Sequence, residues 1–431
     1  MDLKIKPGFL KGTIEAISSK SELHRMLICA AFSDKPTMIR VSGSAYDGNH
    51  EFPKDIQATM SCLKALGADF TEAPGSISVT PVSSKNTGGK TPLLDCRESG
   101  STFRFLLPVA AAFTENASFT GSGRLPERPI IDLSAALKKH GVAFSSDTLP
   151  FTITGKPDGG VYEIPGNISS QFLTGLLLMM PLIPEDIFVR LTTPLVSSGY
   201  IDITTQIMSA FGINVVQKDR EWQLTERRSY TSPSEISAGG DWSNTAAFLT
   251  ASMLREGNEI TCRNLFSDSC QGDRNLLRFL EEFGAGISIF PDSVRSTAGI
   301  LHGTVIDIDD TPDLLPYLAV AACAAVGKTV FCNAGRLRLK ESDRIDSTAA
   351  MIRALGGTAE TDTDQITIYG SGSLRGGTVD SANDHRIVMA SAIAASICDA
   401  PVVIRGAEAV SKSYPTFFED FAGVGGAYHV I

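Results

Sequence analysis

The stretch SDRIDSTAAMIRALGGTAETDTDQITIY, residues 342–369, carries a local pattern that recurs along the whole chain. Ser342-Asp343 is a pair that can cap a helix, and apolar residues follow at helical spacing: Ile345, Ala349, Ile352 and Leu355. Gly356-Gly357 predicts the end of this helix, because glycine tolerates the left-handed conformation that closes one. Residues 358–369 then favour a strand, a polar turn and a second strand.

The same order of helix, glycine, strand, turn and strand returns at intervals of about 72 residues. These helices end at Gly67, Gly141, Gly212, Gly284, Gly356 and, less regularly, Gly425. Another helix, apolar on nearly every face, precedes each of them, and these begin near Lys20, Glu98, Ser169, Asp241, Asp313 and Asp384. A helix that is apolar all round is buried. The period therefore predicts six repeats, each with one buried helix, one amphipathic helix and several strands.

The length of the chain predicts two domains. At 431 residues it is too long for one compact core. The best linker is residues 230–240, a polar stretch with Gly, Ser and Pro, and it divides the six repeats three and three.

Composition excludes several classes of protein. A net charge of −10 argues against general nucleic-acid binding, which needs a basic surface. The 8 cysteines include no CxxC pair, which favours reduced, buried thiols over a disulfide framework or a cysteine nucleophile. The first residues have no signal-peptide core, and the longest apolar stretch, residues 172–183, is short and contains Pro181. We therefore expect a cytoplasmic protein.

The starts of the buried helices hold the unusual residues. Such a helix end presents unpaired N–H groups and the positive end of the dipole, and it binds anions. Ser, Asp and Asn there are explained by ordinary capping. Cations in the first turn are not, since they oppose the dipole, and three starts carry them: Lys20, Arg25, Arg104 and Arg386. They predict a fixed anionic partner.

Two further basic segments lie between the helix starts, at residues 124–129 and 336–344. Either could be a solvated face with ion pairs along a helix, and this is our interpretation of Arg338. It fits Lys340 and Arg344 less well, because they flank Glu341 and Asp343 at the start of another helix.

Taken in order, these motifs resemble the 5-enolpyruvylshikimate-3-phosphate synthase family (3-phosphoshikimate 1-carboxyvinyltransferases) over residues 20–421. No single motif decides this; the ordered set does. It comprises Ser19-Lys20-Ser21 with Arg25, Ser99-Gly100-Ser101-Thr102-Phe103-Arg104, Arg128-Pro129, Ser169-Ser170-Gln171, Tyr200-Ile201-Asp202-Ile203, Gly240-Asp241, Pro312-Asp313, Lys340-Glu341-Ser342-Asp343-Arg344, Asn383-Asp384-His385-Arg386 and Lys412.

The resemblance implies a fold and a domain division. The expected fold is α/β, a two-domain inside-out α/β barrel with six βαβαββ repeats arranged three per domain. Domain I would comprise residues 1–18 and 239–431, domain II residues 19–238, and the active site would lie in the cleft between them.

The resemblance also implies a reaction, in which the enolpyruvyl group of phosphoenolpyruvate moves to the 5-hydroxyl of shikimate 3-phosphate. The implied catalytic residues are Asp313 as base, Glu341 as acid and Lys20 as a proton shuttle. The alternative for Glu341 is a structural ion pair with a neighbouring Arg or Lys. The implied ligands of shikimate 3-phosphate are Lys20, Ser21, Arg25, Ser169, Ser170, Gln171, Ser197, Asp313 and Lys340. Those of phosphoenolpyruvate are Lys20, Gly100, Arg124, Gln171, Arg344, Arg386 and Lys412. We expect a monomer with no metal, no other cofactor and no nucleic-acid or membrane partner.

Some positions depart from the family pattern. Residues 15–19 differ from the usual Pro-Gly-Ser, residues 45–54 form a longer segment than usual, and Arg336 stands where some members have an Asn that contacts shikimate 3-phosphate.

Two other functions remain as alternatives. The sister enzyme that acts on a UDP-amino sugar usually carries a mobile Cys before Arg-Pro, and residues 120–129 contain none. A non-catalytic repeat scaffold would not need cations at buried helix starts.

Overall fold

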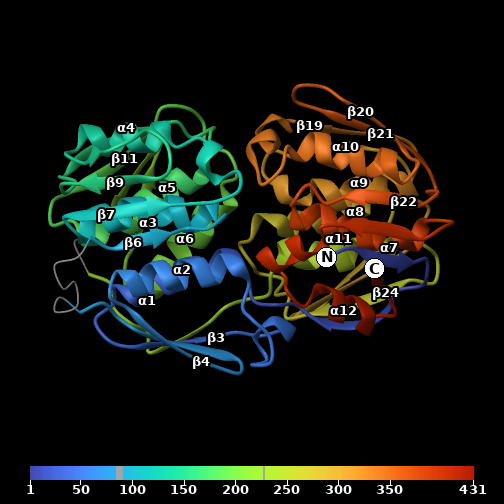
Figure 1. The fold of residues 1–431 in the computed structure, drawn as a ribbon, viewed down its shortest axis with the longest axis horizontal. Helices are drawn as coiled ribbons and strands as arrows, with labels where there is room; N and C mark the ends of the chain where they lie inside the picture. The colour runs from blue at the N-terminus through green and yellow to red at the C-terminus, as the bar shows by residue number, and fades with distance from the viewer. Residues whose placement is uncertain (84–90, 227–228) are drawn as a thin grey trace. The chain divides into compact units, whose positions relative to one another are not determined.

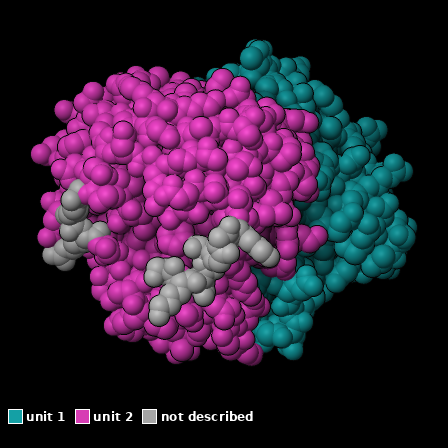
Figure 2. All heavy atoms as spheres, turned by 60° about the vertical axis from the view of Figure 1, so that its left-hand side comes forward, with its two compact units in different colours: residues 1–18, 42–53, 239–431 teal, residues 19–41, 54–238 magenta. Residues whose placement is uncertain are grey.

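The computed structural model describes residues 1–83, 91–226 and 229–431. These residues form two compact units, coloured separately in Figure 2. Unit 1 comprises Met1–Ser18, Ser42–Pro53 and Gly239–Ile431; unit 2 comprises Ser19–Val41 and Lys54–Ala238. The short segment Ser42–Pro53 belongs to unit 1, whereas the predicted boundaries placed it with residues 19–238. Its Ser44 hydroxyl hydrogen-bonds the side chains of Thr416 and Asp420, which belong to unit 1.

Each unit contains three four-stranded sheets among its described residues, and every sheet has the same strand order. The second repeat of unit 2 is the simplest to follow. Its sheet has the order β6-β7-β9-β8, in which β6 and β7 are parallel and β9 is antiparallel to both β7 and β8. Its elements run β6 (Leu93–Asp95), α3 (Gly100–Phe113), β7 (Asn116–Thr120), α4 (Ile131–Lys139), β8 (Ala143–Phe144) and β9 (Phe151–Thr154). This is the predicted βαβαββ repeat.

The other repeats of unit 2 follow the same plan (Figure 1). The third has β10 (Gly160–Ile164), α5 (Ser170–Met179), β11 (Ile187–Leu191), α6 (Gly199–Ala210), β12 (Val215–Lys218) and β13 (Glu221–Leu224). The first has α1 (Lys20–Ala31), β3 (Thr37–Arg40), α2 (Lys54–Ala65), β4 (Asp69–Ala73) and β5 (Ser76–Thr80), and its fourth strand is β14 (Glu235–Ser237). Helices α3 and α5 pack side by side in the middle of this unit.

Unit 1 repeats the arrangement. One repeat has α7 (Trp242–Met253), β15 (Glu259–Arg263), α8 (Leu276–Phe283), β16 (Gly286–Ile289) and β17 (Ser293–Thr297). The next has β18 (Val305–Asp307), α9 (Leu315–Ala324), β19 (Val326–Cys332), α10 (Arg344–Ala354), β20 (Thr358–Thr361) and β21 (Ile366–Ser371). The last has β22 (Gly377–Asp380), α11 (His385–Ala394), β23 (Val402–Arg405), α12 (Phe417–Gly423) and β24 (Ala427–Val430).

Three sheets are completed by strands that are distant in sequence. Strand β14 pairs with β3 in parallel, β2 (Lys11–Glu15) pairs with β15 in parallel, and β1 (Leu3–Lys6) lies between β23 and β24. Both chain ends therefore lie side by side in unit 1 (Figure 1).

Strand β14 also corrects a prediction, because residues 230–240 are not simply a linker. Its three residues, Glu-Ile-Ser, are too few and too polar to show a strand period.

Helix burial and helix ends agree with the sequence pattern. The first helices α3, α5, α7, α9 and α11 consist almost entirely of buried residues. The six predicted stop glycines all have positive φ, from 79° at Gly212 to 104° at Gly67. The buried helix α9 ends at Ala324, and Val326 already begins β19 with 69% of its surface exposed.

The eight cysteines are free thiols in the structure, and six of them are buried. Within residues 1–83, 91–226 and 229–431, no helix combines the length and the apolar character that crossing a bilayer requires.

We predict that Gly284→Ala destabilises unit 1 more than Gly372→Ala does. Gly284 ends α8 at φ 101°, and a Cβ there would overlap the backbone carbonyl of Ile300. Gly372 has φ 88°, but the nearest atom to its Cβ would be the Ala324 carbonyl oxygen at 4.0 Å. The left-handed conformation alone should cost about 1 kcal/mol, and the overlap should add about 2 kcal/mol. Thermal melting of both variants checks this, and equal losses would contradict it.

Candidate active site

Serine caps begin the three buried helices of unit 2. The hydroxyl oxygens of Ser19, Ser99 and Ser169 accept from backbone N–H groups of α1, α3 and α5. Each cap fixes the position of the residues that follow it. Lys20-Ser21, Gly100-Ser101 and Ser170-Gln171 are therefore held at the first turns of three helices that pack together.

Lys20 forms an ion pair within unit 2. Its Nζ lies 2.6 Å from Oδ2 of Asp55, and both side chains are largely buried. Asp55 stands in the first turn of α2, where a carboxylate favours the helix dipole. The sequence indicated Lys20 but missed Asp55, because an acid in a first turn is ordinary and gives no signal by itself.

A buried chain of hydroxyl groups connects the three helices α1, α2 and α3. His24 Nδ1 lies 2.7 Å from Thr59 Oγ1, which lies 2.7 Å from Thr102 Oγ1. Thr102 in turn donates to the Ser99 cap over 2.8 Å. Burial lowers the pKa of His24 well below its usual value, and the neighbouring Lys20 and Arg25 lower it further. His24 is therefore neutral, and it links the Lys20 helix to the helix that begins at Gly100.

Gln171 is held in one orientation by the helix beside it. Its Oε1 accepts from Arg104 Nη1 over 2.9 Å, and its Nε2 donates to Ser101 Oγ over 3.0 Å. Arg104 also donates to the carbonyl of Pro129. A Cβ on Gly100 would lie 2.8 Å from Nη1 of both Arg104 and Arg128. The glycine is therefore needed for two guanidinium groups to approach this helix start.

Arg25 joins the three helices α1, α3 and α6. It is 2% exposed and donates to Thr204 Oγ1 at 2.8 Å, to the Ser21 carbonyl at 2.6 Å and to the Tyr200 carbonyl at 3.1 Å. Its guanidinium also lies over the Phe105 ring. These contacts hold the first turn of α1 in place.

The remaining predicted residues of unit 2 differ in their surroundings. Ser197 is buried, with φ 54°, directly before α6. Ser170 is buried in the first turn of α5. Arg124 is more exposed, and it pairs with Glu127 over 3.7 Å.

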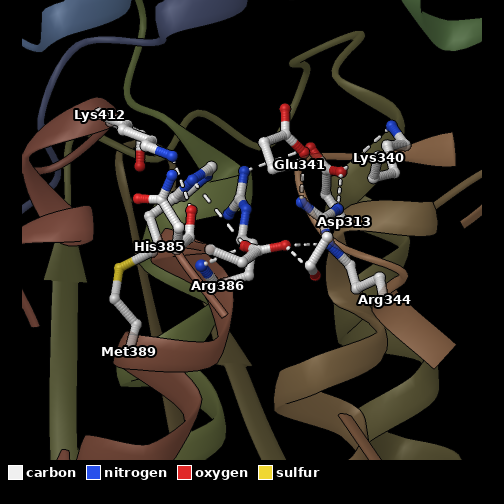
Figure 3. Close-up of polar contacts among 12 residues, drawn as sticks. Asp313, Lys340, Glu341, Arg344, His385, Arg386, Met389 and Lys412 are labelled. Carbon is white, nitrogen blue, oxygen red and sulfur yellow. Dashed lines mark hydrogen bonds and ion pairs between the residues drawn. The ribbon is translucent and has the colours of Figure 1, made fainter. Parts of the chain in front are cut away.

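A second group of predicted residues meets in unit 1, and we call it the Asp313 cluster (Figure 3). It consists of Asp313, Lys340, Glu341, Arg344, Asp384 and Arg386. One oxygen of Asp313 lies 2.6 Å from Arg344 Nη1 and 3.4 Å from Lys340 Nζ, and the other lies 3.3 Å from Arg386 Nη2. The carboxylate is thus surrounded by three cations from different elements.

Arg344 is the most heavily paired cation in the cluster. It is 1% exposed, and its three nitrogens contact Asp313, Glu341 over 2.8 Å and Asp384 over 3.1 Å. Asp384 is fully buried; its other oxygen accepts from the backbone N–H of Arg386 and caps α11. Asp384 therefore locks both Arg344 and the start of α11. The sequence identified it only as a cap.

Arg386 and Lys412 approach from α11 and the short helix η8 (Ala407–Lys412). Arg386 donates to the backbone carbonyl and the hydroxyl of Ser243, over 2.6 and 2.5 Å. Lys412 donates to the carbonyl of Asn383 over 2.6 Å. Arg336, by contrast, pairs with Asp309, away from this cluster.

The pKa values follow from these contacts. Burial alone would raise the pKa of Asp313, but Lys340, Arg386 and Arg344 together hold it well below the usual range. Burial works against the charge of Arg344, and Asp384, Asp313 and Glu341 more than offset it, so the pKa of Arg344 is raised. Asp313 and Arg344 are therefore both ionised at neutral pH.

The two groups have the chemistry of anion sites with acids beside them. Arginine forks and lysines recognise phosphate and carboxylate groups, and Asp313 and Glu341 are available for proton transfer. Within the part of the chain that the structure describes, no group of three or more His, Cys, Asp or Glu residues is arranged to hold a metal ion.

Comparison with known proteins gives one consistent result. Residues 5–421 match the family model for EPSP synthase (3-phosphoshikimate 1-carboxyvinyltransferase). Relatives named 3-phosphoshikimate 1-carboxyvinyltransferase from Clostridium kluyveri and Clostridium acetobutylicum are both 38% identical, over 98% and 99% of this chain and 97% and 98% of their own. The solved structure of EPSP synthase from Acinetobacter baumannii superposes with a TM-score of 0.79, at 25% identity and with 100% of both chains covered.

We predict that Asp313→Asn destabilises unit 1 at neutral pH. The variant leaves three cations without their shared carboxylate, which should cost roughly 2–4 kcal/mol. Because the pKa of Asp313 is depressed in the folded protein, its contribution is present above the unfolded pKa and is lost as pH falls through the folded pKa. The melting-temperature difference from wild type should hold from pH 8 down to about pH 4 and shrink below that. Inorganic phosphate should restore part of it at pH 7.

An equal melting temperature for the two proteins at pH 7 would contradict this prediction. Asp309→Asn is the matched control, because Asp309 pairs with Arg336 outside the cluster. The control should lose less stability, and phosphate should restore none of it.

Proposed function

This chain belongs to the EPSP synthase family, and we infer that it is a 3-phosphoshikimate 1-carboxyvinyltransferase. It transfers the enolpyruvyl group of phosphoenolpyruvate to the 5-hydroxyl of shikimate 3-phosphate and releases phosphate, a step of the shikimate pathway. The observation that carries this conclusion is the family match over residues 5–421, supported by relatives of the same name over nearly the whole chain. The sister reaction on a UDP-amino sugar is not favoured by these matches.

We propose the predicted residues as the substrate ligands. Two phosphates and two carboxylates enter this reaction, and they need arginine forks, lysines and helix N-termini. Shikimate 3-phosphate would be bound by Lys20, Ser21, Arg25, Ser169, Ser170, Gln171, Ser197, Asp313 and Lys340. Phosphoenolpyruvate would be bound by Lys20, Gly100, Arg124, Gln171, Arg344, Arg386 and Lys412. Gln171 suits this role because Arg104 and Ser101 fix its amide.

Asp313 is the proposed base for the 5-hydroxyl. Its depressed pKa keeps it ionised, as a base must be, but also makes it a weak base while three cations surround it. Substrate anions compete for Lys340, Arg344 and Arg386. Binding therefore raises the basicity of Asp313 at the moment when the hydroxyl arrives.

Glu341 is the proposed acid for the methylene carbon of phosphoenolpyruvate, with Lys20 as a proton shuttle. Protonation there creates a cationic centre at C2, and the shikimate oxygen adds to it as its proton passes to Asp313. The tetrahedral adduct then loses phosphate together with a proton from its methyl group, which restores the vinyl double bond. The structural ion pair remains the alternative for Glu341, since its Oε2 lies 2.8 Å from Arg344. The same contact supports a catalytic role, because it places the acid beside a proposed phosphoenolpyruvate ligand.

We also propose that the protein works as a cytoplasmic monomer without nucleic-acid or membrane partners. Its free thiols support a reducing compartment.

The experiment that tests the function is the release of inorganic phosphate from shikimate 3-phosphate and phosphoenolpyruvate together, with each substrate alone as a control. Release that needs only one substrate, or no release, would overturn it.

We predict that Gly100→Ala raises the KM for phosphoenolpyruvate and leaves binding of shikimate 3-phosphate nearly unchanged. The added methyl group would meet the guanidinium ends of the Arg104 and Arg128 side chains and no backbone atom, so the fold should tolerate it. Steady-state kinetics with each substrate varied, together with a melting curve, check this. Equal weakening for both substrates would count against the proposed position of phosphoenolpyruvate.

We predict that Glu341→Gln lowers kcat by about 10²–10⁴-fold, the usual contribution of general acid–base catalysis. The rise in melting temperature on adding shikimate 3-phosphate should survive in this variant, because Glu341 is not a proposed ligand of that substrate. A variant with near-normal kcat and a lower melting temperature would remove Glu341 from the catalytic residues and assign it to the ion pair alone.

A further inference from the structure

The first turn of α7 holds the guanidinium group of Arg386 by one edge. The carbonyl oxygen of Ser243 accepts from Arg386 Nη1 over 2.6 Å, and its hydroxyl oxygen accepts from Nη2 over 2.5 Å. One residue therefore takes a hydrogen from each terminal nitrogen, and we call this pair of contacts the Ser243 clamp. It joins two buried helices, α7 and α11, which pack against one another.

The backbone on both sides of Ser243 is fixed. The N–H of Trp242 donates to Gln271 Oε1 over 3.1 Å, and the N–H of Asn244 donates to Oδ1 of Asp241, the cap of α7, over 2.7 Å. Trp242 and Asn244 are both fully buried. The clamp is therefore a preformed part of the fold, and its position does not depend on a bound substrate.

The opposite edge of the guanidinium, formed by Nε and the second hydrogen of Nη2, is held more weakly. Nη2 lies 3.3 Å from Asp313 Oδ2, a longer contact than either bond of the clamp. Nε is buried and finds no hydrogen-bond partner in the part of the chain that the structure describes. On its remaining side, Nη1 donates to the Tyr317 hydroxyl over 3.2 Å.

An anion has most to gain at this weakly held edge. A buried donor without a partner costs free energy, so an oxygen that reaches Nε removes that cost. Nε and Nη2 point in the same direction, which suits the two oxygens of a carboxylate or phosphate group. Such an anion would replace Asp313 on Nη2, whereas the clamp lies on the other edge and can remain closed.

We propose that Ser243 is a positioning residue for Arg386: the clamp holds the guanidinium in place while its Nε–Nη2 edge exchanges Asp313 for an anionic group of phosphoenolpyruvate. The inference rests on the proposed function of Arg386 as a ligand of that substrate. Ser243 acts through Arg386 and not on the substrate. Without its hydroxyl, the guanidinium keeps only the carbonyl half of the clamp and can turn about that bond, so binding has to order it again.

The first test is Ser243→Ala, with both substrates varied in steady-state kinetics. The KM for phosphoenolpyruvate should rise by about 5- to 30-fold, the effect of losing one hydrogen bond to a charged group. The kcat and the KM for shikimate 3-phosphate should change by less than about twofold. Ser243→Thr keeps the hydroxyl and should restore most of the affinity. Ser243→Cys, with a weakly hydrogen-bonding thiol, takes the place of Ser243→Ala if that variant does not fold.

Ser252→Ala is the matched control on the same helix. The Ser252 hydroxyl is buried, donates to the Ser296 carbonyl and accepts from the N–H of Ile260 over 2.9 Å. Each alanine variant loses a hydroxyl that is hydrogen-bonded inside unit 1, so both should melt at a lower temperature than wild type. Only Ser243→Ala should change the KM for phosphoenolpyruvate.

A double-mutant cycle with Arg386→Lys tests whether Ser243 acts through Arg386. Lysine has no planar fork for the clamp to orient, so Ser243→Ala should change the KM for phosphoenolpyruvate by less than about twofold in that background. An equal fold-change in both backgrounds would overturn the proposal. If Arg386→Lys has no measurable turnover, the comparison of Ser243→Ala with Ser243→Thr and Ser252→Ala decides.

A Ser243→Ala variant with a lower melting temperature and a wild-type KM for phosphoenolpyruvate would also overturn the proposal and leave Ser243 a structural residue. So would equal weakening for the two substrates. These outcomes are distinct from failure of the proposed function, because they require a wild-type enzyme that releases phosphate from both substrates together. A wild type that releases no phosphate would instead remove the function on which the inference rests.

Discussion

The burial of helices that are apolar on every face is the constraint on which the rest of this structure depends. Such a helix must be surrounded, and each unit surrounds its own with three four-stranded sheets and outer helices that end in left-handed glycines. Where the sequence of a repeat lacks a strand, another part of the chain supplies it, as β14, β2 and β1 do. The polar parts of a buried helix are its ends, so the unusual residues of this chain gather at helix starts.

Cations at those starts would destabilise the fold without acceptors beside them. A buried cation that loses its partner costs several kcal/mol, roughly 3–5 by mutation. In unit 1 the ion-pair acceptors of Arg344 are carboxylates, and they are of two kinds. Asp384 is fully buried and serves as the cap of α11, so it is fixed. The side chains of Asp313 and Glu341 are each 20% exposed, and neither caps a helix through its side chain, so they are free to exchange their cations for substrate anions.

Much of this could be predicted from the sequence, because the repeat period and the helix ends are local signals. The positions of the stop glycines and of the buried helices follow from the spacing of residues along the chain. The cations in first turns are recognised because they oppose the helix dipole. Strand β14 could not be predicted, since three polar residues have no period and their pairing with β3 is set by the tertiary fold. Asp55 and Ser243 were missed for a related reason. Each is an ordinary polar residue alone, and only the fold brings it to a cation.

The described contacts of the arginines differ between the two units, and this difference suggests a division of tasks. In unit 2, Arg25 donates to the Thr204 hydroxyl and to backbone carbonyls, and Arg104 donates to the Gln171 amide and to a backbone carbonyl. In unit 1 the charges of Arg344 and Arg386 are shared with carboxylates. Several hydrogen bonds to one guanidinium suit the holding of that group in one orientation. Acids interleaved with cations suit proton transfer, because the position of the cations sets the basicity of the acids. Glu341 and Asp313, the acids among these cations, are therefore the residues whose substitution should alter turnover more than binding.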